Sequence, residues 1–229
     1  MRFPTRLTAH ALLVVLCLNT TIALADESTH PKTDRKPAHV MSYLGADWLE
    51  RADRDALEQP DKVIAAMGLK SGDVVADIGS GSGYFTRRMA KAVLPGGTVY
   101  GVDIQPEMNE ILAENCKKEG IDNIKIILSE EADPKLPPNS IDWMLLVDVY
   151  HEFQQPEVML AKMREALKPG GHVALLEYRL HGDTAEHIKI DHRMSVEQVL
   201  AEWLPAGFTL EKRHEFLPTQ HFFVFRVNK

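Results

Sequence analysis

The sequence predicts one α/β domain built on a doubly wound, mostly parallel sheet, and three observations lead to that fold class. Short apolar runs rich in β-branched residues alternate with segments whose apolar residues recur at helical spacing. A glycine-rich turn at residues 79–83 follows the first of these runs. A proline–glycine–glycine turn at residues 169–171 separates a later helical segment from another apolar run. Repeated strand, turn and helix units of this kind build doubly wound sheets.

The apolar runs indicate where the strands lie. The run at 74–78 is short and β-branched, which is typical of a buried parallel strand. The run at 141–147 is uninterrupted after Asp142, so we expect it at the centre of the sheet. The other expected strands are 98–102, 124–128, a fifth within 167–179, and a terminal pair at 208–213 and 222–227.

Helices are expected between these strands and before the first one. We predict one helix over 45–57, because Trp48, Leu49, Ala52 and Ala56 share a face at helical spacing. A second short helix runs from Pro60 to a glycine stop at 68. The remaining helices are expected directly after the glycine turn, from 106 to about 119, from 156 to 167, and between the cap Ser195 and Gly207.

The charge around the glycine turn indicates which ligand the turn holds. Glycines let the backbone approach a ligand closely, where any Cβ would collide. A dinucleotide fingerprint has the spacing G-x-G-x-x-G and a pyrophosphate on the helix N-terminus. Here the spacing is G-x-G-x-G, Tyr84 takes the place of the third glycine, and Asp77 would repel a pyrophosphate. We therefore favour a cationic ligand with an adenosine end and an amino-acid tail.

Two blocks of the sequence carry a family resemblance. Residues 74–85, VVADIGSGSGYF, resemble motif I of the class I S-adenosylmethionine-dependent methyltransferases, and the block LKPGGHVALLEYR at 167–179 is a second match. The chain is similar to type 11 and type 25 methyltransferase domains over residues 45–229. The resemblance implies a Rossmann-like fold with a seven-stranded sheet, an antiparallel last strand and N-terminal helices that cover the cleft. It also implies that S-adenosylmethionine is the cofactor.

Several side chains are candidates for the cofactor site. Asp103 ends the second expected strand, where a carboxylate accepts hydrogen bonds from both ribose hydroxyls. The resemblance implies that an acid before Ala132 contacts the adenine amine, and Glu131 is the best match, with Glu130 as the alternative. The predicted cofactor-binding residues are Asp77, Gly79, Ser80, Gly81, Gly83, Tyr84, Asp103, Ile104, Met108, Glu131 and Asp148.

The chemistry of methyl transfer points to a second set of residues. Transfer from a sulfonium is an in-line displacement that requires mainly alignment of the reactants. A hydroxyl or ammonium acceptor would need a base, whereas a carbanion or a tertiary amine would not. His151 is the first candidate for the base, His192 is the second, and Asp148 would orient the acceptor or the donor. The alternative for His151 is a histidine that only bonds backbone groups.

Other functions are compatible with parts of the sequence. A metal-assisted transfer would use a divalent ion held by Asp148, Glu177 and a histidine. Because the supporting second-shell pattern is not visible, we predict a site without metal. Two further alternatives are a non-catalytic binding protein of the same fold and a nicotinamide-dependent oxidoreductase.

Residues 1–25 have the features of a secretory signal peptide. Arg2 and Arg6 precede an apolar core at 11–18, and Ala25 ends a small-x-small cleavage sequence. We expect cleavage after Ala25 and export, with the periplasm as the destination. The alternative is an uncleaved membrane anchor over 7–25.

Composition limits the partners of the mature chain. Residues 26–44 are polar and contain prolines, so we predict a flexible leader before a domain at 45–229. The full chain has a net charge of −7, and loss of residues 1–25 leaves 24 basic against 33 acidic residues, a net charge of −9. This balance argues against a nucleic-acid partner, which needs a basic patch. No mature segment approaches membrane-spanning length, and we expect a small-molecule acceptor.

Overall fold

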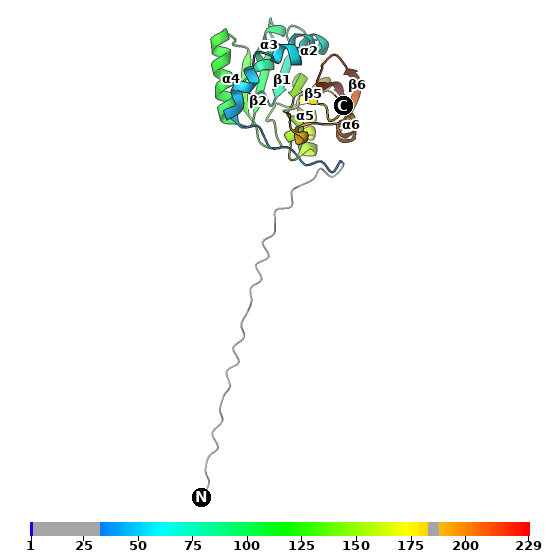
Figure 1. The fold of residues 1–229 in the computed structure, drawn as a ribbon. Helices are drawn as coiled ribbons and strands as arrows, with labels where there is room; N and C mark the ends of the chain where they lie inside the picture. The colour runs from blue at the N-terminus through cyan, green and yellow to red at the C-terminus, as the bar shows by residue number, and fades with distance from the viewer. Residues whose placement is uncertain (2–32, 183–187) are drawn as a thin grey trace.

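A seven-stranded sheet runs through the centre of the protein in the computed structural model, which describes residues 33–182 and 188–229 besides Met1 (Figure 1). Its strands are β1 (Val74–Ile78), β2 (Thr98–Asp103), β3 (Ile124–Leu128), β4 (Ile141–Val147), β5 (Leu167–Tyr178), β6 (Phe208–His214) and β7 (Gln220–Val227). The spatial order is β3-β2-β1-β4-β5-β7-β6, and only β7 pairs antiparallel with its neighbours. The predicted fold class and its antiparallel last strand are confirmed.

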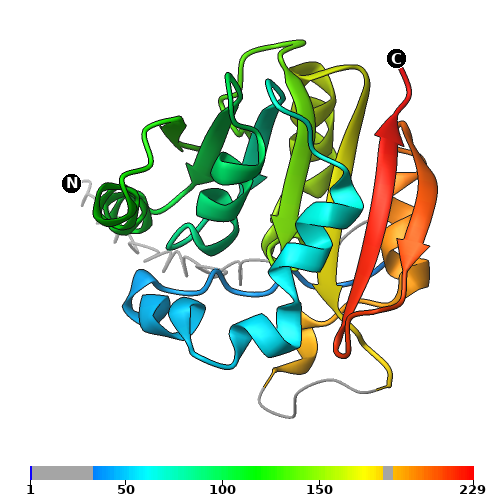
Figure 2. The ribbon, with the colours of Figure 1, turned by 90° about the horizontal axis from the view of Figure 1, so that it is seen from above.

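Helices cover both faces of this sheet (Figure 2). Successive strand residues point to opposite faces, so β5 supplies both cores. Val173 packs in the cluster that contains Trp203, whereas its neighbour Ala174 packs in the cluster that contains Met89. The helices on the Trp203 side are α5 (Pro156–Ala166) and α6 (Val196–Trp203), and those on the other side include α2 (Pro60–Met67) and α3 (Tyr84–Ala92). Beside α3, α4 (Pro106–Glu119) packs on β2, with Leu112 against Gly101.

Most helix boundaries follow the expected signals. Prolines occupy the first turn of α2, α4 and α5, and Ser195 caps α6 in a complete capping box with Gln198. Two helix ends differ from the prediction, and the first is that of α6, which ends at Trp203 before the expected stop at Gly207. The helix α5 ends at Ala166, and Leu167 already pairs with Ile141, so the proline–glycine–glycine turn lies inside β5.

The N-terminal part of the domain differs more from the prediction. The single helix expected over 45–57 is wrong: a 3₁₀ helix, η1 (Tyr43–Glu50), precedes a separate short helix, α1 (Arg54–Glu58). Neither Trp48 nor Leu49 is buried, and the buried side chains are instead Arg54 and Glu58, whose Nε and Oε2 atoms lie 2.8 Å apart. An ion pair, rather than an apolar stripe, therefore fixes this segment.

The segment 33–42, which we call the strap, also differs from the flexible leader expected over 26–44. Arg35 is buried in an ion pair with Glu202 of α6, and Ala38 is buried as well. Residues 33–42 therefore pack on the domain, although they precede the boundary expected at 45. The predicted signal peptide at 1–25 lies outside the described residues. Within 33–182 and 188–229, no helix has the length and hydrophobicity needed to cross a bilayer.

Candidate functional site

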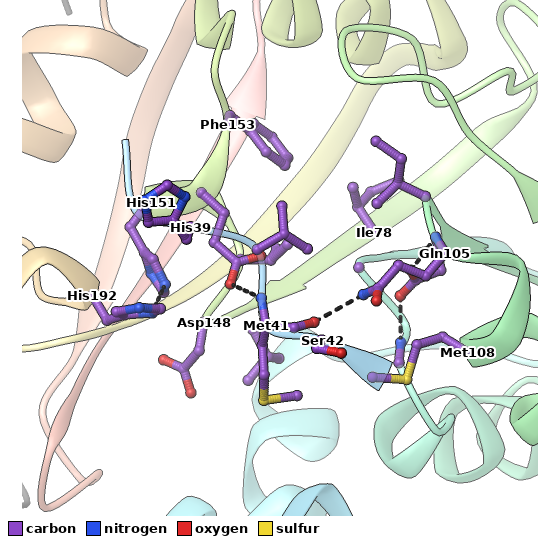
Figure 3. Close-up of a pocket in the computed structure, with 18 of the residues that line it drawn as sticks. His39, Met41, Ser42, Ile78, Gln105, Met108, Asp148, His151, Phe153 and His192 are labelled. Atoms are coloured by element: carbon purple, nitrogen blue, oxygen red, sulfur yellow. Dashed lines mark hydrogen bonds between the residues drawn. The ribbon is translucent and has the colours of Figure 1, made fainter. Parts of the chain in front are cut away.

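A cavity of about 570 Å³ opens at the carboxyl ends of β1, β2 and β4. Strand order reverses between β1 and β4, and ligands of doubly wound sheets bind at such a point. Ile78 and Asp103, the last residues of β1 and β2, line the cavity together with Asp148, which directly follows β4. Figure 3 shows His151 and His192 at one end of the cavity and Gln105 and Met108 at the other.

The glycine turn forms the floor of the cavity because only glycine fits two of its positions. Gly79 and Gly81 have φ angles of 72° and 51°. A Cβ on Gly79 would lie 2.4 Å from Cγ2 of Val149, and one on Gly81 would lie 2.7 Å from Cδ1 of Leu49 in η1. The missing side chains leave a backbone cradle between β1 and α3.

Asp103 fixes this cradle from the neighbouring strand. Its Oδ2 accepts a hydrogen bond from the Gly81 amide at 2.9 Å, and its Oδ1 accepts one from the Gln105 amide at 2.9 Å. Burial raises the pKa of the carboxyl above its usual value, although these amides oppose the rise. Each oxygen can accept a second bond, so a diol in the cavity can bind there.

The structure brings most of the predicted cofactor residues to this cavity. Seven of them line it: Gly79, Gly81, Asp103, Ile104, Met108, Glu131 and Asp148. Glu130, the alternative for adenine, lines it too. The other four, Asp77, Ser80, Gly83 and Tyr84, lie behind the cavity wall rather than in it.

Two of these four side chains support the loop from beneath. Asp77 is buried, and its Oδ2 accepts a hydrogen bond from Thr86 Oγ1 at 2.6 Å. Burial raises the pKa of Asp77 to about 6. Tyr84 packs under the guanidinium of Arg54, 4.1 Å from its ring centre, and donates a hydrogen bond to Asp55. Any effect of Asp77 or Tyr84 on a ligand is therefore indirect.

Asp148 is held in an unusual conformation at the middle of the cavity. Its φ angle is 51°, which is uncommon for a residue with a side chain. Gln220 of β7 donates to its Oδ2 at 2.7 Å, while its Oδ1 is buried with no hydrogen-bond partner. Burial, with nearby Glu58 and Glu177, raises the pKa of Asp148 well above its usual value. A cationic or hydroxyl group of a ligand would supply the missing partner.

A chain of three side chains lies at the other end of the cavity, where His151 and His192 line it and Glu177 is buried behind them. Glu177, at the end of β5, has its Oε2 2.6 Å from His151 Nδ1, and the Tyr150 amide donates to its Oε1 at 2.8 Å. Because a carboxylate only accepts, His151 Nδ1 carries a proton. His151 Nε2 then lies 3.0 Å from His192 Nδ1. His151 thus bonds side chains at both ring nitrogens, which argues against a role confined to backbone contacts.

The pKa values of the two histidines are shifted in opposite directions. Burial lowers the pKa of His151, but the adjacent Glu177 carboxylate outweighs burial and leaves that pKa raised. Burial and the neighbouring His151 lower the pKa of His192. Glu152 also lines the cavity, and burial raises its pKa to about 7. This end of the cavity therefore contains a carboxyl group able to exchange a proton near neutral pH, beside two histidines whose pKa values are shifted apart.

The strap closes the cavity from the N-terminal side. The Ala38 amide donates to the His151 carbonyl at 2.9 Å, and the Met41 amide donates to Glu152 Oε1 at 3.0 Å. Gln105 Nε2 donates to the Met41 carbonyl at 2.9 Å (Figure 3). The strap therefore contacts both ends of the cavity, and four of its residues, 39–42, line it.

Sequence reasoning missed several residues of the site. Glu152 and Gln105 line the cavity although their surroundings in the sequence contain no motif that singles them out. Arg54 also lines it, from a segment expected to pack through apolar residues. The strap was missed because its polar, proline-bearing composition is typical of a linker. Glu177 was considered only as a metal ligand, and the structure shows it as the partner of His151.

The residues present fit an adenosyl ligand with an amino-acid tail. The glycine cradle is a space that any Cβ would fill, and Asp103 offers oxygens for a ribose diol. Asp148 Oδ1 is a buried oxygen that lacks a donor. The acidic groups around the cradle favour a cation over a phosphate.

Comparisons with known proteins agree with this geometry. The profile of a family described as a methyltransferase domain matches residues 69–218 of this chain. A demethylmenaquinone methyltransferase from Staphylococcus aureus is 31% identical over 116 residues. That alignment covers 51% of this chain and 47% of the relative, so the chain spans about half the length of the curated relatives it matches.

Solved structures share the fold over 82% of this chain. A SAM-dependent methyltransferase from Aquifex aeolicus superposes with a TM-score of 0.78 at 25% identity, covering 82% of this chain and 100% of that one. A phosphoethanolamine N-methyltransferase 2 from Haemonchus contortus, in complex with phosphomonomethylethanolamine and S-adenosylhomocysteine, superposes with a TM-score of 0.61 at 18% identity. That match covers 82% of this chain and 60% of the other, and it shows the fold alone.

Proposed function

The chain belongs to the methyltransferase domain family, and from that premise we propose that it methylates a small molecule with S-adenosylmethionine as the donor. One observation carries the proposal. A single cavity joins the glycine cradle and Asp103 at one end to the Glu177–His151–His192 chain at the other. Donor and acceptor can therefore meet inside it, as an in-line transfer requires.

The donor occupies the cradle end in this proposal. S-adenosylmethionine supplies the methyl group on a sulfonium, which becomes a neutral thioether as the methyl group leaves. Asp103 accepts the ribose hydroxyls, Glu131 or Glu130 meets the adenine, and the backbone at Gly79 and Gly81 admits the amino-acid tail. Asp148, between the two ends, offers its unpartnered oxygen to a cationic group.

The acceptor occupies the histidine end. Glu177 holds His151 in the tautomer with its proton on Nδ1, and the histidine pair is then able to take a proton from the acceptor. The bond from acceptor to methyl forms as the bond from methyl to sulfur breaks. The proton is retained by the pair, and the Glu177 carboxylate balances the new charge. The presence of this chain favours an enzyme over a non-catalytic binding protein.

The size and lining of the cavity support a small acceptor. Its volume of about 570 Å³ lies within the range of sites for small ligands. The strap supplies residues 39–42 to the lining and is hydrogen-bonded to His151 and Glu152, which narrows the space left for an acceptor. We propose an organic acceptor with an ionisable hydroxyl group, which is one of the two acceptor classes that need a base, the other being an ammonium group. The name of the S. aureus relative points to a quinone-related substrate in that protein, and quinols carry hydroxyls of this kind.

Calorimetry tests the donor half of the proposal. Titration of the purified chain with S-adenosylmethionine should show one site, and Asp103→Asn should weaken it by roughly 10- to 100-fold, since hydrogen bonds to charged groups contribute about 1.5–3 kcal/mol. Asp122→Asn is the matched control, because Asp122 is exposed and precedes β3 at the far edge of the sheet. No binding at millimolar donor, or equal affinity in both variants, would refute the assignment.

Turnover tests the acceptor half. Incubation with donor and a panel of small phenols, quinols and amines should release S-adenosylhomocysteine with a hydroxyl-bearing acceptor. Tight donor binding without release of S-adenosylhomocysteine, whichever acceptor is added, would support the binding-protein alternative instead. NADH titrated under the same conditions should give no heat, and a saturable signal there would favour an oxidoreductase.

We also propose that residues 1–25 direct export and are removed after Ala25. Cleavage there would leave the strap complete, because the strap begins at residue 33. N-terminal sequencing of protein recovered from the periplasm should begin at Asp26. An intact N-terminus in the membrane fraction would support the anchored alternative.

A further inference from the structure

Three metal-ligating side chains converge at the histidine end of the cavity. One ligand atom from each of His151, Glu152 and His192 lies within 4.8 Å of the others. All three residues line the cavity, so an ion held between them would have an open side toward a ligand. This trio differs from the Asp148 and Glu177 pair that the sequence suggested for a metal.

The spacing of the two ring nitrogens suits a shared ion. His151 Nε2 and His192 Nδ1 lie 3.0 Å apart. Two nitrogens at ~2.1 Å from a metal are ~3.0 Å apart when the angle at the metal is near 90°, and ~3.4 Å apart in a tetrahedral site. His192 is only half-buried, so small movements of its ring would allow either nitrogen–nitrogen separation.

A buried carboxylate also orients His151 in the way that metal-bound histidines need. A ligating histidine usually donates its other ring N–H to a carboxylate, which fixes its orientation and raises its basicity. Glu177 is fully buried and accepts from His151 Nδ1 at 2.6 Å, so His151 Nε2 points away from it. Glu152 is oriented by the Met41 amide on Oε1, which leaves Oε2 for an ion.

We propose that His151 Nε2, His192 Nδ1 and the Glu152 carboxylate bind a divalent first-row transition ion on the acceptor side of the cavity. Two imidazoles and one carboxylate with open positions are a donor set that such ions prefer over Mg²⁺ or Ca²⁺. The inference rests on the proposed function for its role. An ion bound there would act as a Lewis acid on an acceptor oxygen and ease loss of its proton to solvent, whereas without the ion the histidine pair would take that proton.

Binding of Co²⁺ to the purified, EDTA-treated chain tests the proposal without any assay of activity. Visible absorption of Co²⁺ should saturate at one ion per chain, and a stoichiometric amount of Zn²⁺ should bleach the spectrum. His192→Ala and Glu152→Ala should each lose the saturable signal. His172→Ala is the matched control, because its ring stacks on Trp143 and bonds Glu211 outside the cavity, and it should bind as the parent does.

A second variant keeps the test decisive if a ligand variant fails to fold. Glu177→Gln keeps the three ligands and should weaken Co²⁺ binding by roughly 10- to 100-fold, as does loss of a carboxylate that orients a ligating histidine. Equal Co²⁺ affinity in the parent, the Glu177 variant and the folded His192 variant would overturn the proposal. Donor calorimetry on the same samples separates this failure from failure of the methyltransferase assignment, because the cradle contains none of the three ligands.

Discussion

The two ends of the cavity are built in different ways. The proposed donor end comes mainly from two consecutive units of the fold, within residues 78–108, together with Glu130 and Glu131 after β3, and its floor is the backbone of the glycine turn. The proposed acceptor end combines the strap with residues after β4, at the end of β5 and in the 3₁₀ helix η3 (Ile190–His192), and its polar lining includes the ionisable side chains of His151, Glu152 and His192. A site made of backbone changes only with the fold, whereas one made of side chains can change by substitution. The same fold can therefore serve many acceptors.

The two ends would be separated most clearly by a substitution that slows methyl transfer without weakening donor binding. His151→Gln should lower the rate of methyl transfer by roughly 10²- to 10⁴-fold, as expected for loss of a positioned base. Donor affinity by calorimetry should change by less than ~3-fold, since the cradle is untouched. His172→Gln should leave both quantities at their parental values. A variant at His151 that loses donor binding as well would show that the ends are not independent.

A substitution in the strap tests how much its long-range contacts stabilise the folded protein. Arg35→Ala removes one partner of a buried pair whose Nε and Oε1 atoms lie 2.9 Å apart, and leaves Glu202 buried. Urea unfolding should show a loss of about 3–5 kcal/mol. Arg226→Ala is the control, because its 2.7 Å pair with Glu211 is largely exposed, and it should cost less than ~1 kcal/mol. Equal losses would mean that the strap contributes no special stability.

A glycine substitution tests the donor end by steric means. Gly79→Ala forces a Cβ to within 2.4 Å of Val149 Cγ2 and holds alanine at a φ of 72°. Donor affinity should fall by roughly 10- to 100-fold, since overpacking costs about 1–3 kcal/mol. Gly120→Ala has a similar φ of 65° but open space around its Cβ. That control should lose a little stability and no donor affinity.

An effect confined to a pH window is expected from Asp77, beneath the donor end. Its folded pKa of about 6 exceeds the ordinary value of 3.8, so the native state binds more protons than the unfolded state between those pH values. This contribution therefore lowers the free energy of unfolding as pH rises through that window. Asp77→Asn should stabilise the protein by up to ~3 kcal/mol at pH 8 and by almost nothing below pH ~4. Asp122→Asn should show no such pH dependence in urea titrations, and a flat difference for the Asp77 variant would contradict the prediction.

The strands, the fold class and the glycine turn were predictable because their signals are local. The β-branched run at 74–78, the glycine turn after it and Asp103 at the end of the next strand lie close in the sequence, and the sheet topology brings them together. Helix boundaries also followed local signals such as Pro106 and the Ser195 cap. In the same way, His151 was identifiable because it follows the central strand.

What the sequence could not determine depends on contacts between distant segments. Asp77 and Tyr84 stand inside the glycine motif, but packing on α3 and Arg54 turns them away from the cavity. The sequence alone determined the sheet and its glycine cradle, because strand, turn and helix are dictated by residues a few positions apart. Only the tertiary structure decided that residues 33–42 close the cavity and that Glu152 meets the two histidines. These contacts join residues more than 35 positions apart, and a local pattern carries no information about them.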